Sequence, residues 1–179
     1  GIIAGKRDYV RAAYLQNTGI ARGMKIGKES MAGAIRAMEL WMERDHAAAR
    51  REERASLDMW VDHLSGIPGF LVRIMPDPTG NPLERLQIDV DPLSSGSTAA
   101  AIARHLGSLD PAVVVRNHKI ELGYFQLDPC NLAPGQAEIV GRTLREVLLS
   151  AATLPQSAND ADAARNGGVD AYLNWIAPR

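Results

Sequence analysis

Residues 70–149 predict a two-layer α+β fold, in which helices cover one face of a mostly antiparallel sheet. Two runs of alternating apolar residues flank the turn-forming stretch Asp77-Pro-Thr-Gly-Asn-Pro82, and this pattern indicates a β-hairpin. Two further apolar runs, at 112–115 and 120–124, predict strands, and helical patterns follow the hairpin and close the segment. The resulting order, β-β-α-β-β-α, is typical of that fold class.

The elements of this segment follow from local signals. Apolar residues alternate in Phe70, Val72, Ile74 and again in Leu86, Ile88, Val90. Ser94 to Ser97 can cap a helix over 97–106 that ends at Gly107. A last helix opens at Pro134-Gly135, with an inner face of Ile139, Leu144, Val147 and Leu148. Beyond Ser150 we expect a loose tail, with a short helix near Tyr172-Leu-Asn-Trp175.

The N-terminal segment predicts a short buried strand at Ile2-Ile3-Ala4, closed by Gly5, and a helix over 7–17. A strand needs neighbours, and the sequence of 179 residues does not begin with an initiator methionine. We therefore expect it to be the C-terminal portion of a longer protein.

A long helical region is predicted over 28–66, where Gly66 and Pro68 stop it. It carries an apolar stripe, a charged alanine-rich middle over 43–56 and a second apolar stripe. The first stripe comprises Met31, Ile35, Met38 and Met42, and the second Leu57, Trp60, Val61 and Leu64. One bent helix and two abutting helices both fit, and the first stripe is interpreted as core or as a dimer seam.

Composition narrows the class of protein. The net charge is −1 with charges mixed along the chain, so nucleic acid is not an expected partner. The single cysteine, Cys130, excludes an internal disulfide and suits the cytoplasm. No membrane-spanning segment is predicted, and the scattered histidines predict no metal site.

A glycine-rich loop over 18–27 is the strongest candidate site. Gly19, Gly23 and Gly27 alternate with the cations Arg22, Lys25 and Lys28 just before a helix begins. Glycines allow close backbone approach, and a helix N-terminus favours negative charge. The pattern is typical either of an anion site or of a solvated basic loop.

Arg116 ends the run Val113-Val-Val115. Such an arginine can offer its fork to a carboxylate or phosphate of a ligand, or form an ordinary salt bridge. Cys130 has no obvious base beside it and is interpreted as an inert thiol. His118, in a predicted turn after Arg116, is interpreted as a surface residue of some interest.

Several motifs resemble one family. Arg22-Gly-Met-Lys-Ile-Gly-Lys-Glu29 resembles the Arg-x-Met-Lys-Val-Gly-Lys-Glu signature of the D-glucosaminate-6-phosphate ammonia-lyases, within the selenocysteine-synthase-like pyridoxal-phosphate enzymes. Three further segments agree in order: Gly1-Ile-Ile-Ala-Gly-Lys-Arg-Asp8, Asp110-Pro-Ala-Val-Val-Val-Arg116 and Leu127-Asp-Pro-Cys-Asn-Leu-Ala-Pro-Gly-Gln136. The resemblance covers roughly residues 1–150.

The resemblance implies a fold-type I pyridoxal-phosphate transferase, an α/β family, of which this chain is mostly the α+β C-terminal small domain. Residues 1–27 would end the large cofactor-binding domain, 28–66 form a long bridging helix, 67–150 the small domain and 151–179 a loose tail. The lysine that holds pyridoxal phosphate would lie before Gly1, so the full-length protein, and not this chain alone, would be the enzyme.

The resemblance also implies elimination of ammonia from a phosphorylated or polyhydroxy amino acid, by a homodimer or larger assembly. Arg22 and Lys25 match two basic positions and would bind the phosphate or carboxylate of the substrate, and Arg116 is a further candidate for the carboxylate. The cofactor-binding residues stay unassigned. Two alternatives stay open: selenium transfer to seryl-tRNA by a related enzyme, and a non-enzymatic anion-binding or dimerisation domain.

Overall fold

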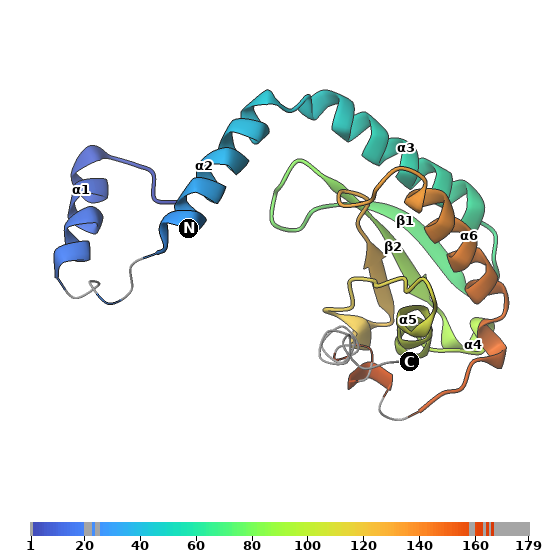
Figure 1. The fold of residues 1–179 in the computed structure, drawn as a ribbon. Coiled ribbons are helices and arrows are strands. Elements are labelled where there is room, and N and C mark those ends of the chain that lie inside the picture. The colour runs from blue at the N-terminus through green and yellow to red at the C-terminus, as the bar shows by residue number, and fades with distance from the viewer. Residues whose placement is uncertain are drawn as a thin grey trace. The chain divides into compact units, whose positions relative to one another are not determined.

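The computed structural model describes residues 2–19, 23, 26–157, 160–162, 164 and 166. The chain divides into two compact units, Gly1–His46 and Ala47–Arg179, which are described separately (Figure 1).

The first unit contains two helices. Helix α1 spans Arg7–Leu15 and continues as a single 3-10 turn over Gln16–Thr18, and helix α2 spans Lys28–Glu43. Neither helix contains a buried residue. The predicted strand at residues 2–4 is wrong, since this segment has no regular secondary structure. Ile2 lies instead beside α2, where it lines a pocket with Ala34 and Met38. A helix has no free backbone edge with which a strand could exchange hydrogen bonds.

The helical region predicted over 28–66 is two helices rather than one. Helix α2 ends because Arg44 has extended backbone angles, with φ −66° and ψ 133°, and helix α3 spans His46–Leu64. The His46 ring hydrogen-bonds the Trp41 carbonyl through Nε2 at 2.8 Å. That carbonyl belongs to the last turn of α2, where the helix itself offers no partner. The imidazole ring of His46 thus caps a backbone carbonyl at the C-terminal end of α2.

A three-stranded antiparallel sheet, in the order β1-β2-β3, organises the second unit. Strands β1 (Phe70–Pro76) and β2 (Glu84–Val90) form the predicted hairpin, in register Phe70↔Val90. Strand β3 spans Tyr124–Leu127 and pairs with β2. Side chains alternate between the faces of a strand, so Leu86 and Ile88 are buried while Arg85 and Gln87 point to the opposite face.

Of the two later predicted strands, the one at 112–115 is not formed and the one at 120–124 is displaced to Tyr124–Leu127, which corrects the order β-β-α-β-β-α to β-β-α-α-β-α. Residues 112–115 make no ladder, and the neighbouring Arg116 forms an isolated bridge to Gln126. The Val113 N–H donates to the Leu106 carbonyl instead of to a strand. Ile120–Leu122 is a 3-10 turn, ended by Gly123 at φ +80°. Val113 and Val115 pack in the core all the same, while Val114 between them is exposed. An apolar run has the same sequence pattern with or without a ladder.

Helices complete the second unit. Helix α4 spans Pro92–Ser95, α5 Ala99–Ser108 and α6 Gln136–Leu149, followed by a 3-10 turn over Ala151–Thr153. The cap of α5 is Thr98, whose hydroxyl accepts the Ala101 N–H at 3.1 Å, and not the predicted Ser94 to Ser97. The helix also continues one residue past Gly107, since Gly107 lies within α5.

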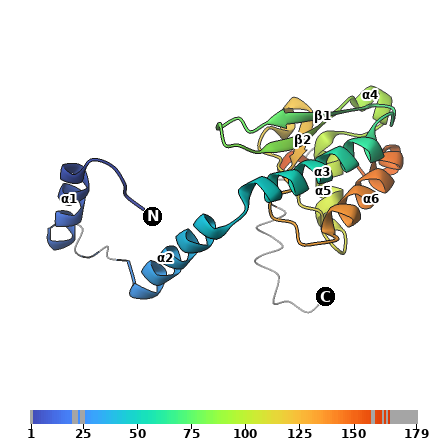
Figure 2. The same cartoon turned by 90° about the horizontal axis from the view of Figure 1, so that it is seen from above.

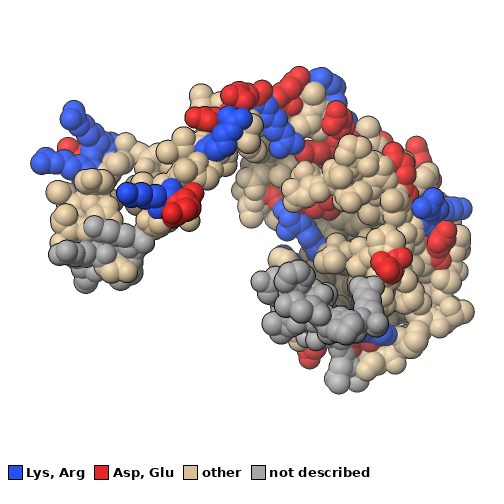
Figure 3. Space-filling model, in the orientation of Figure 1, with Lys and Arg blue, Asp and Glu red and all other residues tan. Residues whose placement is uncertain are grey.

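The core of the second unit lies between the sheet and α3, α5 and α6, which pack on one face of it (Figures 1 and 2). Its members from the three helices are Leu57, Trp60, Leu64, Ile102, Leu106, Leu144, Val147 and Leu148. The rest of α3 carries interspersed acidic and basic side chains (Figure 3), as the charged middle of the helical region predicts. No helix among the described residues is long and apolar enough to cross a membrane.

The start of the tail packs more firmly than predicted. Ala151 and Leu154 join the core, and the carboxylate of the buried Asp160 pairs with Arg104 Nε at 2.6 Å. A buried carboxylate needs such a partner, which fixes this turn against α5. The short helix predicted near 172–175 lies outside the described residues.

Candidate functional site

The glycine-rich loop holds two of the three predicted substrate-binding residues, Arg22 and Lys25, and both lie outside the described residues. Lys28 is exposed at the first position of α2. The role of this loop in binding an anion therefore stays a prediction.

Arg116, the third predicted residue, lies beside the edge strand β3. Its backbone N–H donates to the Gln126 carbonyl at 2.7 Å and its carbonyl accepts the Gln126 N–H at 2.9 Å. Its side chain is 41% exposed, and Nε and Nη2 both donate to one Asp128 oxygen, at 3.1 and 2.8 Å. The salt bridge left open by the sequence is thus formed, and it holds the guanidinium in one orientation.

A pocket of about 310 Å³ lies around Arg116 on the face of the sheet opposite the core. We call it the open-face pocket. It is lined by Met75, Pro76, Pro78, Arg85, Gln87, Arg116, His118, Lys119, Tyr124 and Gln126. Its volume is at the lower end of the range of small-molecule sites, and most of its lining side chains can donate a hydrogen bond.

Two aspartates support the arginines of the pocket. Arg85 forms ion pairs with Asp77 and, through Nε at 3.4 Å, with Asp128. The exposed fraction of the Arg85 and Asp128 side chains is 12% each. In a medium of low dielectric such pairs interact strongly, so Asp77, Arg85, Asp128 and Arg116 form one connected row of charges.

The Asp77 carboxylate is stabilised in its charged form. The hydroxyl of Thr79 donates to it, as do the backbone and side-chain N–H groups of Asn81, the latter at 2.8 Å. The Thr79 hydrogen bond is the largest cause that lowers the pKa of Asp77 to about 2, against the opposing effect of burial. This row of charges therefore has a permanent anion at its inner end at neutral pH.

The floor of the pocket is a ladder of hydrogen-bonded polar side chains. Gln126 Nε2 donates to Gln87 Oε1 at 3.0 Å, and Gln87 Nε2 donates to Asp89 Oδ1 at 2.9 Å. Arg73 closes the ladder from β1 by donating to Asp89 Oδ2 through Nη2 at 2.7 Å. These bonds fix the rotamers of both glutamine amides beneath the pocket.

Cys130 lies next to this site and stays a neutral thiol at neutral pH. Its backbone N–H donates to Asp128 at 3.2 Å. Burial, followed by the hydrogen bond and charge of Asp128, raises the pKa of Cys130 to about 11. For Asp128 itself, burial raises the pKa, but hydrogen bonds from Cys130 and Arg116 outweigh it and lower the pKa overall. A thiol with so high a pKa is a poor nucleophile, in agreement with the interpretation from sequence.

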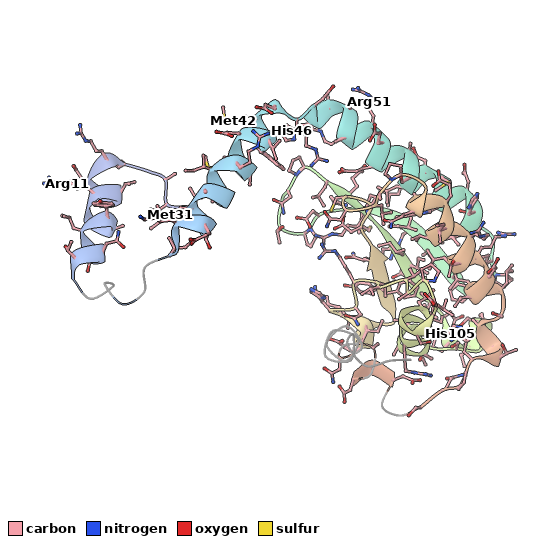
Figure 4. All side chains as sticks on the ribbon, viewed as in Figure 1. Arg11, Met31, Met42, His46, Arg51 and His105 are labelled. Atoms are coloured by element: carbon pink, nitrogen blue, oxygen red, sulfur yellow. The ribbon has the colours of Figure 1, made fainter. Side chains whose placement is uncertain are left out.

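The histidines do not converge. His46 begins α3 and His105 lies on α5 (Figure 4), His63 lies near the end of α3, and His118 lines the open-face pocket. Within the described ranges, no group of three or more His, Cys, Asp or Glu side chains could hold a metal ion.

Sequence reasoning missed most of the pocket. Arg85 and Gln87 are the polar positions of an alternating strand, and strand alternation alone does not show that they lie beside Arg116. Lys119 and Tyr124 carried no signal, because the turn at Ile120–Leu122 that brings them to the pocket was predicted as a strand.

The fold of this chain matches part of a solved enzyme of the ammonia-lyase class. No family model matches the chain. The structure of a D-glucosaminate-6-phosphate ammonia-lyase matches 83% of it, and 39% of that protein, with a TM-score of 0.60 and 30% identity.

Two sequences give the same result. D-glucosaminate-6-phosphate ammonia lyase of Salmonella typhimurium is 31% identical over 152 residues, or 85% of this chain. A 5'-C-glycyluridine monooxygenase-decarboxylase of Streptomyces is 34% identical over 166 residues, or 90% of it. The chain spans 40% of the length of each relative. It is therefore a homologue of the C-terminal portion of D-glucosaminate-6-phosphate ammonia-lyase, as the motifs predicted, and also of this second enzyme, which the motifs did not indicate.

Proposed function

We propose that this chain is the C-terminal part of a pyridoxal-phosphate-dependent enzyme of the ammonia-lyase type. The full-length protein would act by elimination on a phosphorylated or polyhydroxy amino acid. The observation that carries the proposal is the match to an ammonia-lyase in both sequence and structure, over 85% and 83% of the chain. The single cysteine is in keeping with a cytoplasmic enzyme.

We assign substrate binding to this chain and leave its cofactor-binding residues unassigned. The described lysines do not form an enclosed cofactor site: Lys6 and Lys28 are exposed in the first unit, and Lys119 is exposed at the open-face pocket. Pyridoxal phosphate, held by a lysine elsewhere in the full-length protein, would supply the electron sink for the reaction. Arg22, Lys25 and Arg116 would bind the acidic groups of the substrate, since each offers charge-assisted hydrogen bonds.

The test is made on the full-length protein. A visible absorbance band from covalently held pyridoxal phosphate is expected, and a colourless protein that neither binds the cofactor nor releases ammonia would refute the proposal. Arg22→Ala should raise KM or abolish turnover of a phosphorylated amino acid while the cofactor band persists. Arg11→Ala, which removes an exposed arginine from α1, is the matched control and should leave turnover unchanged.

A second candidate is supported by the higher identity to the monooxygenase-decarboxylase, 34% over 90% of the chain. An enzyme of that type would consume O₂ and release CO₂, whereas a lyase releases ammonia without O₂. Product analysis under air and under nitrogen separates the two, because only the oxygenase stops under nitrogen.

We further propose assembly as a homodimer or larger. The exposed stripe of α2 supports this, since Met31, Ile35, Met38 and Met42 are 48–82% exposed. An apolar stripe of this size on a soluble protein marks an interaction site. Sedimentation of the full-length protein should show an oligomer that Met38→Glu weakens, and a monomeric parent protein would contradict the proposal.

A further inference from the structure

We propose that the open-face pocket binds a phosphate group through Arg116, His118 and Lys119. The inference deepens the proposed function, on which it rests for the identity of the ligand as a phosphorylated substrate. It assigns His118 and Lys119, which neither the motifs nor the relatives single out, to the binding of that phosphate. The pocket itself is argued from charge, hydrogen-bonding capacity and size.

The charges of the pocket leave room for an anion. Arg85 is neutralised by Asp77 and Asp128, and Arg116 shares Asp128 with it. Lys119 forms no ion pair with any residue in the described part of the chain. Three cations, Arg85, Arg116 and Lys119, therefore face two carboxylates, Asp77 and Asp128. The net charge of this group is +1 before His118 is considered. Such an excess of positive charge around a concave site attracts an anion.

Arg116 has a free edge for such a ligand. Asp128 occupies the edge formed by Nε and Nη2, with both bonds to the same oxygen. The terminal edge keeps the hydrogens of Nη1 and the second hydrogen of Nη2, because a guanidinium has five N–H donors in a rigid plane. Asp128 therefore positions the guanidinium and leaves it able to bind a second acid group.

The donor set suits a phosphate better than a carboxylate. A carboxylate has two oxygens, which one arginine fork satisfies. Lys119 and His118 line the same pocket as Arg116, so the donors of these three side chains exceed the one fork that satisfies a carboxylate. A phosphate monoester presents three oxygens and a charge near −2 at neutral pH. The Gln87 and Gln126 amides and the Tyr124 hydroxyl could bind hydroxyl groups of the same ligand.

The proposal is tested by titrating the full chain with inorganic phosphate at constant ionic strength and monitoring the titration by heteronuclear NMR. Saturable shifts are expected for the amides of 116–119, Gln126 and Tyr124, with acetate giving at least tenfold weaker binding. Lys119→Met should weaken phosphate binding about tenfold, the effect of losing one charge-assisted hydrogen bond. Lys119→Arg should retain most of the affinity.

Lys6→Met is the control, because Lys6 is an exposed lysine of the other unit and should not change the affinity. Equal binding by Lys119→Met and the parent chain, or equal affinity for acetate and phosphate, would overturn the proposal. So would an absence of saturable shifts at the pocket. Because no cofactor enters this experiment, its failure is distinguishable from a colourless, inactive full-length protein, which would refute the proposed function.

Discussion

Trp60 in the second unit and Trp41 in the first unit lie in opposite environments, one buried and one exposed. Trp60, in the second unit, is 1% exposed and donates its indole N–H to the Ala137 carbonyl at 2.8 Å. Trp41, in the first unit, is 62% exposed and stacks at a tilt against His46, with ring centroids 4.4 Å apart. A tryptophan is therefore part of the core in the second unit, whereas a tryptophan of the first unit lies on the surface.

The two tryptophans differ because α3 packs against other elements of its unit, whereas α2 has no buried residue. Helix α3 packs its apolar stripe on a sheet and on two other helices of its unit, whereas no residue of α2 is buried. An amphipathic helix gains most of its stability from burying its apolar face. The second unit thus has its own core, whereas the apolar stripe of α2 is exposed in the described part of the first unit. That exposed stripe is the one to which we assign the proposed oligomer contact.

The largest expected effect comes from Trp60, with Trp41 as its counterpart in the first unit. Trp60→Ala should destabilise the second unit by about 3–5 kcal/mol, because it leaves a cavity in the core. Trp41→Ala should change the free energy of unfolding by no more than about 0.5 kcal/mol. Urea denaturation followed by far-UV circular dichroism measures both. A large loss for Trp41→Ala would show that the stripe of α2 is already buried in solution.

A glycine substitution in the second unit sharpens the comparison further. Gly69 has φ +84°, and a Cβ there would lie 2.4 Å from the Ser95 backbone nitrogen. Gly69→Ala should therefore cost at least about 2 kcal/mol, from strain and from displaced backbone. Thermal unfolding checks this value. A cost within the error of the measurement would mean that the turn between α3 and β1 does not hold α4 in place.

Acid should affect the second unit through Asp77. Its pKa of about 2 lies below the ordinary value of 3.8, so its charged form stabilises the fold fully above about pH 4. That contribution is lost as the pH falls from 4 through 2, because the unfolded state binds the proton first. Asp77→Asn should thus lower Tm at pH 7 and have a smaller effect at pH 2. Equal effects at both pH values would show that the Asp77 charge does not support the row of charges.

The sequence predicted those parts of the fold that depend on local alternation and helical spacing. The β1–β2 hairpin and the helices have apolar side chains at periods of 2 and 3.6. The hairpin was correct, and the described helices were correct in place but not in their bounds, since 28–66 forms two helices and α5 is capped by Thr98. The strand at 112–115 was wrong because Val113 and Val115 are buried without a ladder. A buried valine run indicates burial, and the backbone partner of Val113, the Leu106 carbonyl, lies in a helix that sequence periodicity cannot place.

The pocket was less predictable than the fold, because it is assembled from residues far apart in the chain. Arg116 could be singled out as the charged end of an apolar run. Its partner Asp128 and the neighbouring Arg85 depend on the pairing of β2 with β3, in register Leu86↔Leu127. That register is set by the whole sheet, so the row of charges could not be derived from any single segment.

The smallest expected effect tests the first unit alone. Gly33 is exposed on α2, and a Cβ there would meet no atom within 4 Å. Gly33→Ala should therefore stabilise α2 by about 0.5–1 kcal/mol, since alanine loses less backbone entropy in a helix. Helicity of the first unit, measured by the carbonyl chemical shifts of 28–43, should rise while the shifts of the second unit stay unchanged. A loss of helicity would indicate that Gly33 is needed where another helix or chain approaches α2 closely, which would extend the interaction surface beyond the methionine stripe.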